Sequence, residues 1–243
     1  MLKWLLFFVG AGLFYLWLKG KKQAKLNQKN ASQASADKAP KAIKPEVMVQ
    51  CQCCKVHLPK PDAIAHDGRF YCCQEHLNTL DGQGWMGFAN WRLSPNQDVR
   101  PENIQPDLVV IHHISLPPGE FRNQVSSQHI TDFFQNTLDP TGHPYFAEIA
   151  DQKVSSHFLI TRLGELVQFV STQNKAWHAG ISCFMGREKC NDFSIGIELE
   201  GDGESSFEEV QYQTLVNLVA KLASVYPDLH YSGHSDIAPN RKT

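Results

Sequence analysis

The sequence lacks the features that would mark several classes of protein. Its 243 residues carry a formal net charge of -2, which gives no argument for nucleic acid as a partner. It contains no internal repeat, and its longest uncharged apolar run, residues 4–18, is shorter than the roughly 20 residues that a membrane span needs. Its 42% hydrophobic and 20% charged residues are ordinary for a globular protein, so composition alone names no function.

The short apolar run nevertheless predicts an N-terminal membrane helix, residues 1–19. Lys3 precedes the run, whereas Lys19 and four further lysines up to Lys29 follow it. By the positive-inside rule this asymmetry predicts a single-pass inner-membrane protein whose main part faces the cytoplasm, with the membrane as a partner. The alternative is a cleaved secretory signal, for which the small residues at 31–36 offer a cleavage site, but lysines directly after the run argue against it. Residues 20–45 lack large apolar side chains and predict a flexible linker.

Cysteine is scarce outside one short window, since five of the seven cysteines lie between residues 51 and 73. A cluster beside histidines suits a metal site in a reducing compartment better than a spread disulfide framework. The spacing predicts a small zinc-binding module at residues 46–80, with a second, structural zinc ion and an unknown partner. Its predicted ligands are Cys51, Cys54, Cys72 and His76, with Cys53 and Cys73 as alternatives. The plainer interpretation is that these cysteines only pack.

The motif of this module resembles one found in a family of short, membrane-anchored bacterial proteins of unknown function. Those proteins carry a zinc-ribbon-like C-x2-C and Y-C-x3-H pattern, which Tyr71-Cys72 and Glu75-His76 match. A closed four-ligand site implies a structural or partner-binding role and not catalysis.

From Gly84 onward the pattern predicts an α/β domain with a mixed central sheet flanked by helices. Residues 108–115 are typical of a buried strand, residues 156–170 of a hairpin turning near Leu163-Gly164, and residues 193–201 of an alternating strand. In that last strand Glu198 faces away from the core side. Apolar spacing predicts a helix over 207–226, with Ser205 and Glu208 as a capping box at its start.

Several stretches of residues 84–243 carry a resemblance. They are GW at 84, SPNQDVRP at 94, VVIHHISLPPGEF at 109, TLDPTGHPYFAEI at 137, VSSHFLI at 154, AWHAG at 176, CNDFSIGIELEG at 190 and GHSDIAPNRKT at 233. They resemble the zinc-dependent N-acetylmuramoyl-L-alanine amidases, and within them the cytoplasmic branch that recycles 1,6-anhydro-muropeptides. The resemblance implies the zinc amidase fold and a muropeptide substrate.

The resemblance also implies a catalytic site with one zinc ion. It assigns His112 and His234 as metal ligands, Glu198 as the proton acceptor and Lys242 as the cation that stabilises developing negative charge. The family's third ligand is an aspartate two residues after the lysine, which is expected just beyond Thr243, so we expect the domain to be truncated at its C-terminus. The chemistry would be hydrolysis of the amide between the lactyl group of muramic acid and L-alanine.

Four further residues are predicted to bind substrate. His113 takes the place of a family asparagine, Trp177 and His178 lie in the AWHAG stretch, and Lys189 stands where the family has a basic residue for the stem peptide. Three of them have a plain alternative: Trp177 could fill space, His178 could fix a turn and Lys189 could simply face solvent. Two other functions stay open, a non-catalytic binding module for peptidoglycan fragments and an exported amidase of the cell wall.

Overall fold

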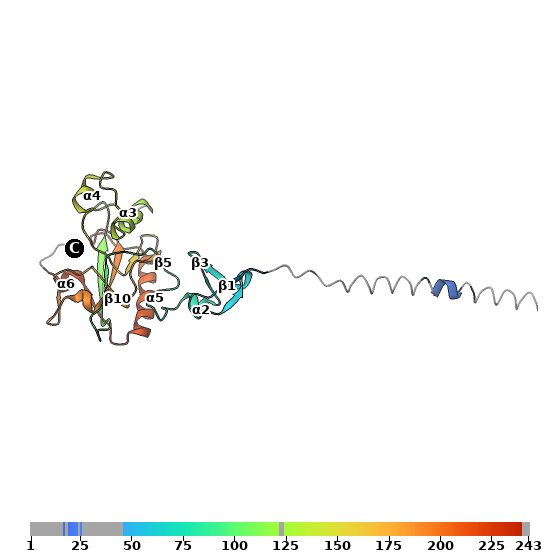
Figure 1. Cartoon of the computed structure of the whole chain (residues 1–243). Coiled ribbons are helices and arrows are strands. Elements are labelled where there is room, and N and C mark those ends of the chain that lie inside the picture. The colour runs from blue at the N-terminus through green and yellow to red at the C-terminus, as the bar shows by residue number, and fades with distance from the viewer. Residues whose placement is uncertain (1–16, 18, 24, 26–45, 122–123, 240–243) are drawn as a thin grey trace, which may run out of the picture. The chain divides into compact units, whose positions relative to one another are not determined.

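The structure is a computed structural model that describes residues 17, 19–23, 25, 46–121 and 124–239. The chain divides into two compact units, Met1–Glu46 and Val47–Thr243. The second unit contains both the cysteine-rich segment and the predicted α/β domain (Figure 1). The predicted boundary between residues 80 and 84, and the linker at 20–45, stay predictions.

The predicted membrane helix lies almost entirely outside the described residues, since only Trp17 and Lys19 of residues 1–19 are described. Where the structure describes the chain, it contains no helix with the length and apolar character needed to cross a membrane. This finding corrects the predicted single-pass inner-membrane location and its membrane partner. The prediction gave too much weight to the lysine asymmetry around a run that is shorter than the roughly 20 residues of a span.

The cysteine-rich segment folds as two hairpins followed by a short helix. Strand β1 (Met48–Gln50) pairs with β2 (His57–Pro59), and β3 (Ile64–His66) pairs with β4 (Arg69–Tyr71). The second hairpin turns through Asp67 and Gly68, whose φ angles of 44° and 74° suit the Asp-Gly pair of a tight hairpin. A 3-10 turn, η1 (Lys60–Asp62), connects the hairpins, and α2 (Gln74–Leu77) follows them.

The central sheet of the second unit has six strands in the order β14-β7-β13-β8-β9-β5. They are β14 (His230–Gly233), β7 (Leu108–Ile114), β13 (Ser194–Glu200), β8 (Phe158–Ile160), β9 (Leu166–Gln168) and β5 (Asn90–Trp91). The first four run parallel to one another, whereas β8 and β9 form an antiparallel hairpin. The predicted mixed sheet is therefore confirmed, as are the strands at 108–115 and 193–201.

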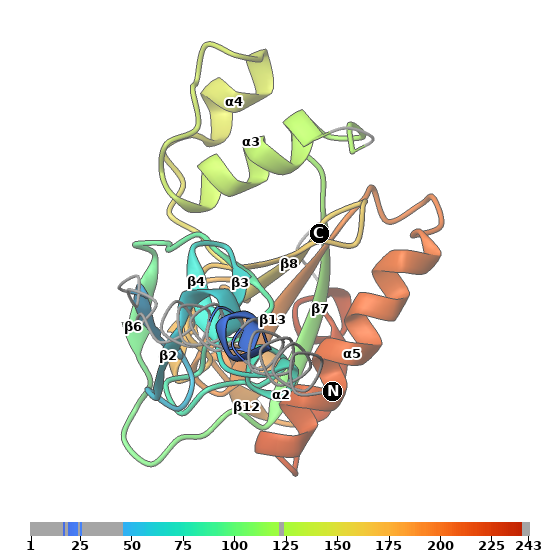
Figure 2. The same cartoon turned by 90° about the vertical axis from the view of Figure 1, so that its right-hand side faces the viewer.

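Helices cover both faces of this sheet (Figure 2). Helix α5 (Glu209–Val225) packs Leu218 and Leu222 against the face formed by Val109, Ile195 and Ile197. Helices α3 (Gln124–Phe134) and α4 (Pro144–Ile149) pack over the β8-β9 part of the sheet on a separate apolar cluster. Two small ladders, β6 (Gln97–Val99) with β10 (Asn174–Ala176) and β11 (Cys183–Phe184) with β12 (Arg187–Glu188), and the short η2 (Cys190–Asp192) and α6 (His234–Ile237) complete the described elements.

The predicted N-cap of α5, Ser205, is wrong by three residues. The N-cap is Glu208, whose side chain and that of Gln211 form the reciprocal capping box. Ser205 instead belongs to a tight turn in which the carboxylate of Asp202 accepts its backbone N–H at 2.8 Å. Since Asp, Ser and Glu can all bond to nearby backbone donors, the sequence offers several candidate caps at this position.

Candidate active site

Three parallel strands bring the predicted catalytic residues together. In the β7-β13 ladder, His112 stands opposite Glu198, and both side chains leave the face of the sheet that α5 does not cover. In the β14-β7 ladder, Gly233 stands opposite Ile111, so His234 begins α6 beside His112. The carboxylate of Asp236 accepts the backbone N–H of Gly233 at 3.0 Å and fixes the turn that presents His234.

The two predicted metal ligands meet through the same ring atom. His112 Nδ1 and His234 Nδ1 lie 2.9 Å apart, and both residues are buried, with exposed fractions of 7% and 8%. Burial is the main cause that holds the pKa of His112 well below its ordinary value, and the electrostatic effect of the neighbouring His178 and His234 lowers this pKa further. His112 is therefore a neutral imidazole, which is the form that binds metal ions.

Glu198 completes the group. Its Oε1 lies 3.8 Å from His112 Nδ1, and its Oε2 has no hydrogen-bond partner among the described residues. Burial raises the pKa of this carboxyl to about 8. A buried carboxyl whose Oε2 has no hydrogen-bond partner among the described residues, next to two buried imidazoles, fits a divalent cation because a nearby positive charge favours its ionised form. These residues thus fit the catalytic zinc that the sequence predicts.

Comparison with known proteins identifies the family. Residues 102–243 match the family described as N-acetylmuramoyl-L-alanine amidase. The chain belongs to this amidase family.

Its relatives include enzymes whose names specify the bond that they cleave. The 1,6-anhydro-N-acetylmuramyl-L-alanine amidase AmpD of Escherichia coli K12 is 50% identical over 163 residues, which cover 66% of this chain and 87% of that protein. The enzyme of the same name from Haemophilus influenzae is 49% identical over 152 residues, covering 61% of this chain and 80% of the relative. A crystal structure of a selenomethionine derivative of AmpD is 48% identical with a TM-score of 0.63, and covers 66% of this chain and 89% of that one.

The other predicted residues of the amidase lie at varied distances from the histidine pair. His178 contacts His112 directly, with His112 Nε2 and His178 Nδ1 2.9 Å apart. His113 leaves the opposite face of β7, and its ring lies against Gly203, where an added Cβ would come within 2.5 Å of Nε2. Trp177 donates its indole N–H to Asp98 at 2.9 Å. Lys242 lies outside the described residues.

Lys189 lines a cavity next to α6. This cavity of about 610 Å³ is bounded by α6 on one side and the β11-β12 ladder on the other. Its lining is Gly180, Ile181, Ser182, Cys183, Glu188, Lys189, Ile237, Ala238 and Pro239. Ile237, at the end of α6, lines the cavity, and His234 begins the same helix.

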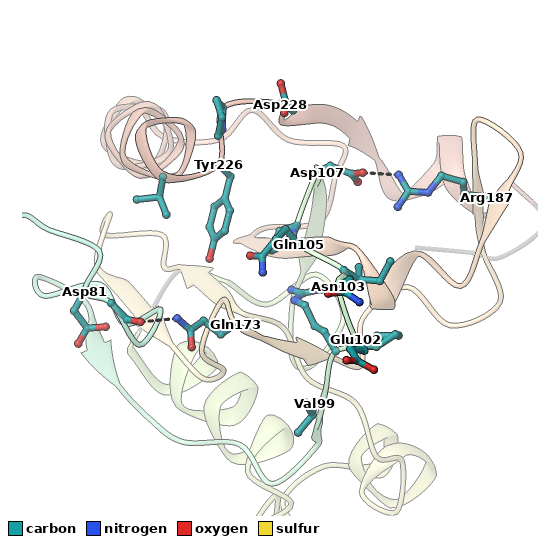
Figure 3. A pocket seen from close by; sticks show the side chains of 17 residues that line it. Asp81, Val99, Glu102, Asn103, Gln105, Asp107, Gln173, Arg187, Tyr226 and Asp228 are labelled. Carbon is teal, nitrogen blue, oxygen red and sulfur yellow. Dashed lines mark hydrogen bonds and ion pairs between the residues drawn. The ribbon is translucent and has the colours of Figure 1, made fainter.

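A second cavity, of about 990 Å³, lies at the other end of the parallel strands (Figure 3). Asp107, which precedes β7, lines it, as do Tyr226 and Asp228, which lie between α5 and β14. In open parallel sheets, ligands bind beyond the carboxyl ends of the strands. Although this cavity is the larger of the two, it lies at the amino ends of the strands, so we assign the active site to the histidine end.

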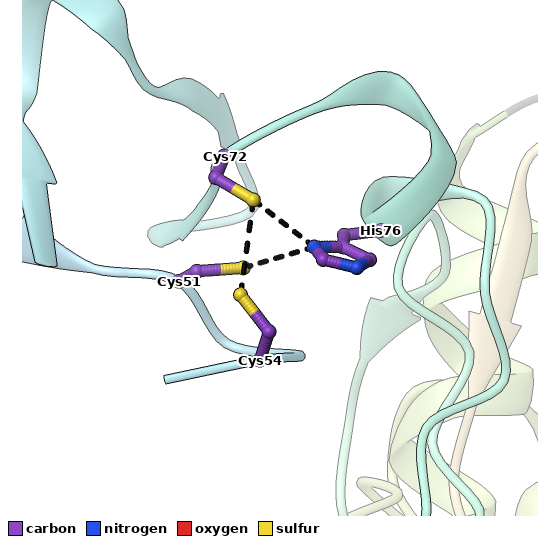
Figure 4. A group of neighbouring side chains, drawn as sticks. All are labelled: Cys51, Cys54, Cys72 and His76. Atoms are coloured by element: carbon purple, nitrogen blue, oxygen red, sulfur yellow. Dashed lines mark hydrogen bonds between the residues drawn. The ribbon is translucent and has the colours of Figure 1, made fainter. Parts of the chain in front are cut away.

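The four predicted ligands of the cysteine-rich segment converge (Figure 4). The ligand atoms of Cys51, Cys54, Cys72 and His76 all lie within 4.8 Å of one another. Cys72 Sγ is 3.0 Å from His76 Nδ1 and Cys54 Sγ is 3.8 Å from Cys72 Sγ. Burial alone would raise the pKa of Cys51, but backbone hydrogen bonds from Cys54 and Cys72 outweigh it and lower the pKa to about 6.

Sequence reasoning missed the contacts that join this segment to the amidase. The Tyr71 hydroxyl donates to the carbonyl oxygen of Gly87 at 3.0 Å. The carboxylate of Asp67 accepts the backbone N–H of Trp91 at 3.0 Å and pairs with Arg92 at 3.3 Å. The periodicity of the sequence does not predict such contacts, because they join side chains of one hairpin to backbone atoms and one side chain around β5.

Proposed function

We propose that this chain is a zinc-dependent hydrolase of muropeptides. It cleaves the amide bond between the lactyl group of 1,6-anhydro-N-acetylmuramic acid and L-alanine, in the recycling of peptidoglycan. The convergence of His112, Glu198 and His234 at the carboxyl ends of three parallel strands is the observation that carries this proposal. The names of relatives that are about half identical to this chain support the substrate.

His112 and His234 would hold the zinc ion through Nδ1. Zinc bound there would polarise the amide carbonyl, lower the pKa of water toward about 7 and favour the ionised form of Glu198. The family's amidases depend on zinc, which agrees with the neutral state of His112.

Glu198 is the proton carrier of the reaction. Its carboxylate accepts a proton from the attacking water and later delivers it to the amine of the departing L-alanine. A carboxyl whose pKa lies near neutrality can do both. Burial raises the pKa of Glu198, and a zinc ion bound nearby would lower it. We assign Lys242 to the developing negative charge on the carbonyl oxygen, where a fixed cation acts most strongly in the transition state.

The cavity beside α6 is the proposed site of the stem peptide. Most residues that line it are small or apolar, and Lys189, which follows Glu188 in the same lining, supplies a cation for a peptide carboxylate. Lys189 is exposed, so its flexible ammonium can reach a bound ligand. We keep His113 and Trp177 as proposed substrate contacts, although each also has a structural partner.

The cysteine-rich segment is proposed to hold a second, structural zinc ion. Three thiols and one imidazole are a usual set for a closed tetrahedral zinc site. Residues 46–80 would then form a zinc-ribbon-like module, and residues 84–243 the amidase domain. Loading with zinc should stabilise a segment that is too short to bury a core of its own.

The reaction itself tests the proposal. The full-length protein, loaded with zinc, should release free stem peptide from 1,6-anhydro-muropeptide, as measured by chromatography. Glu198→Gln should lower kcat by at least about 100-fold because the proton carrier is lost. Glu209→Gln, an exposed change on α5, is the matched control and should leave kcat unchanged. Substrate binding without any release would favour the non-catalytic alternative, and full activity of Glu198→Gln would refute the mechanism.

A further inference from the structure

His178 links the histidine pair to a chain of hydrogen bonds that ends at a backbone carbonyl. Its Nδ1 lies 2.9 Å from His112 Nε2, and its Nε2 lies 3.1 Å from the hydroxyl of Ser194. Ser194 donates its hydroxyl hydrogen to the carbonyl oxygen of Cys190 at 2.6 Å. Every member of this chain is therefore tied to the next by a contact of hydrogen-bond length.

The carbonyl at the end of the chain fixes the position of each proton. A carbonyl oxygen can only accept a hydrogen bond, so Ser194 donates its single hydroxyl hydrogen to the carbonyl oxygen of Cys190. The Ser194 oxygen then accepts from His178 Nε2–H, which leaves His178 Nδ1 without a proton. His178 Nδ1 accepts in turn from His112 Nε2–H. In a neutral imidazole only one nitrogen carries hydrogen, so His112 Nδ1 presents a lone pair toward His234.

We propose that His178 is a positioning residue of the amidase, which holds His112 in the tautomer and orientation that a metal ligand requires. This inference rests on the proposed role of His112 as a ligand. A ligand histidine usually donates its other N–H to a carboxylate, a carbonyl or water. Here a second imidazole takes that place, and its acceptor state is set by Ser194 and Cys190.

The backbone around His178 holds its ring in place. Asn191 Oδ1 accepts the backbone N–H groups of His178 and Ala179 at 3.1 and 2.8 Å. On the sheet side, the ring lies directly on Gly196, where an added Cβ would come within 2.6 Å of His178 Cγ. Gly196 stands two residues before Glu198 in β13, so only a residue without a side chain leaves room for this ring beside the proton carrier.

The tautomer is measurable without turnover. In the metal-free protein with 15N-labelled histidine, two-bond 15N–1H correlation spectra should show His112 protonated at Nε2. His178→Leu removes the acceptor and should shift His112 toward the other tautomer. His178→Asn places an amide oxygen near the position of Nδ1 and should retain the original tautomer.

Metal affinity gives a second readout. Cobalt(II) serves as the probe, because thiolate charge-transfer bands separate an ion in the cysteine site from one at the histidines. His178→Leu should weaken cobalt binding at the histidine site by about 10- to 100-fold, and His178→Asn should restore most of the loss. His230→Leu, an exposed histidine at the other end of β14, is the control and should bind as the unchanged protein does.

The outcomes separate this inference from the proposed function. Protonation of His112 at Nδ1 in the unchanged protein, or normal cobalt affinity in His178→Leu, would overturn the role of His178 even if hydrolysis is normal. If His178→Leu does not fold, Ser194→Ala tests the same chain, because it frees the His178 tautomer and should weaken cobalt binding in the same direction. An unchanged protein with the expected tautomer but no metal at the histidines would instead overturn the zinc-dependent function.

Discussion

Buried His157 should make the stability of this protein depend on pH between 7 and 5. Its side chain is fully buried, and its Nδ1 accepts the backbone N–H of Gly196 at 3.0 Å. Its Nε2–H is then available to the carbonyl oxygen of Asn174, also at 3.0 Å. Burial, reinforced by the charge of Arg100, lowers the pKa of His157 to about 3. The folded protein therefore keeps this imidazole neutral.

The sign of the effect follows from which state binds more protons. An unfolded histidine has a pKa of about 6.5, so below that pH the unfolded chain takes up a proton that folded His157 refuses. The free energy of unfolding must fall as the pH drops from 6.5 toward 3. One pKa unit corresponds to about 1.4 kcal/mol, so this single group should remove about 2 kcal/mol between pH 7 and pH 5.

The assay compares pH dependence between two proteins. Urea unfolding of the unchanged protein and of His157→Gln, each at pH 7 and pH 5, isolates the contribution of this group from those of the other histidines. The unchanged protein should lose about 2 kcal/mol more than the variant over this range. His230→Gln controls for loss of an exposed imidazole. Equal losses in the unchanged protein and His157→Gln would refute the reasoning.

Three further predictions concern stability. Tyr71→Phe should lower the free energy of unfolding by about 1 to 2 kcal/mol in chemical denaturation, because the buried carbonyl of Gly87 loses its donor. Glu200→Gln should cost about 2 kcal/mol in the same assay, since this buried carboxylate accepts from the hydroxyls of Ser126 and Ser127 in α3 and from the backbone N–H of Arg162. A zinc chelator should increase hydrogen exchange in β4 and α2 of the unchanged protein, whereas Cys54→Ser should exchange rapidly with or without chelator. An unchanged exchange pattern would contradict the structural metal site.

The two central strands were predictable for different reasons, since residues 108–115 begin with a continuous apolar run and residues 193–201 alternate. Val109, Ile111, Ile195 and Ile197 share one face of the sheet with the apolar side of α5, and this pattern is visible in the sequence. The start of α5 was not predictable to the residue, because the choice of Glu208 depends on a tertiary contact. Its carboxylate pairs with Arg162 at 2.7 Å across the end of the β8-β9 hairpin.

In the candidate site, too, contacts between residues far apart in the sequence could not be predicted from local sequence patterns. His112, Glu198 and His234 were predicted from a family resemblance, since no local pattern in the sequence indicates what they bind. His178 was assigned to the substrate, yet it contacts His112, which is 66 residues away in the sequence. A single histidine in a turn carries no signal for such a contact, because the contact depends on how β13 and the preceding loop pack. The membrane location was wrong for the opposite reason, since a local pattern was extended beyond its length.

The register of the sheet is itself a component of the proposed active site. His112 and His234 are separated by 122 residues, and only the pairing of β14 and β13 on either side of β7 brings them to Glu198. A slip of one residue in β7 would turn His112 toward the apolar face that α5 covers and would put Ile111 in its place. The ladder with β13 runs unbroken from Leu108 to Ile114, and in it Val109 and Ile111 pack on the α5 side while Leu108 and Val110 pack in a separate apolar cluster. The same alternation that makes the core therefore directs the imidazole and the carboxyl to a common point.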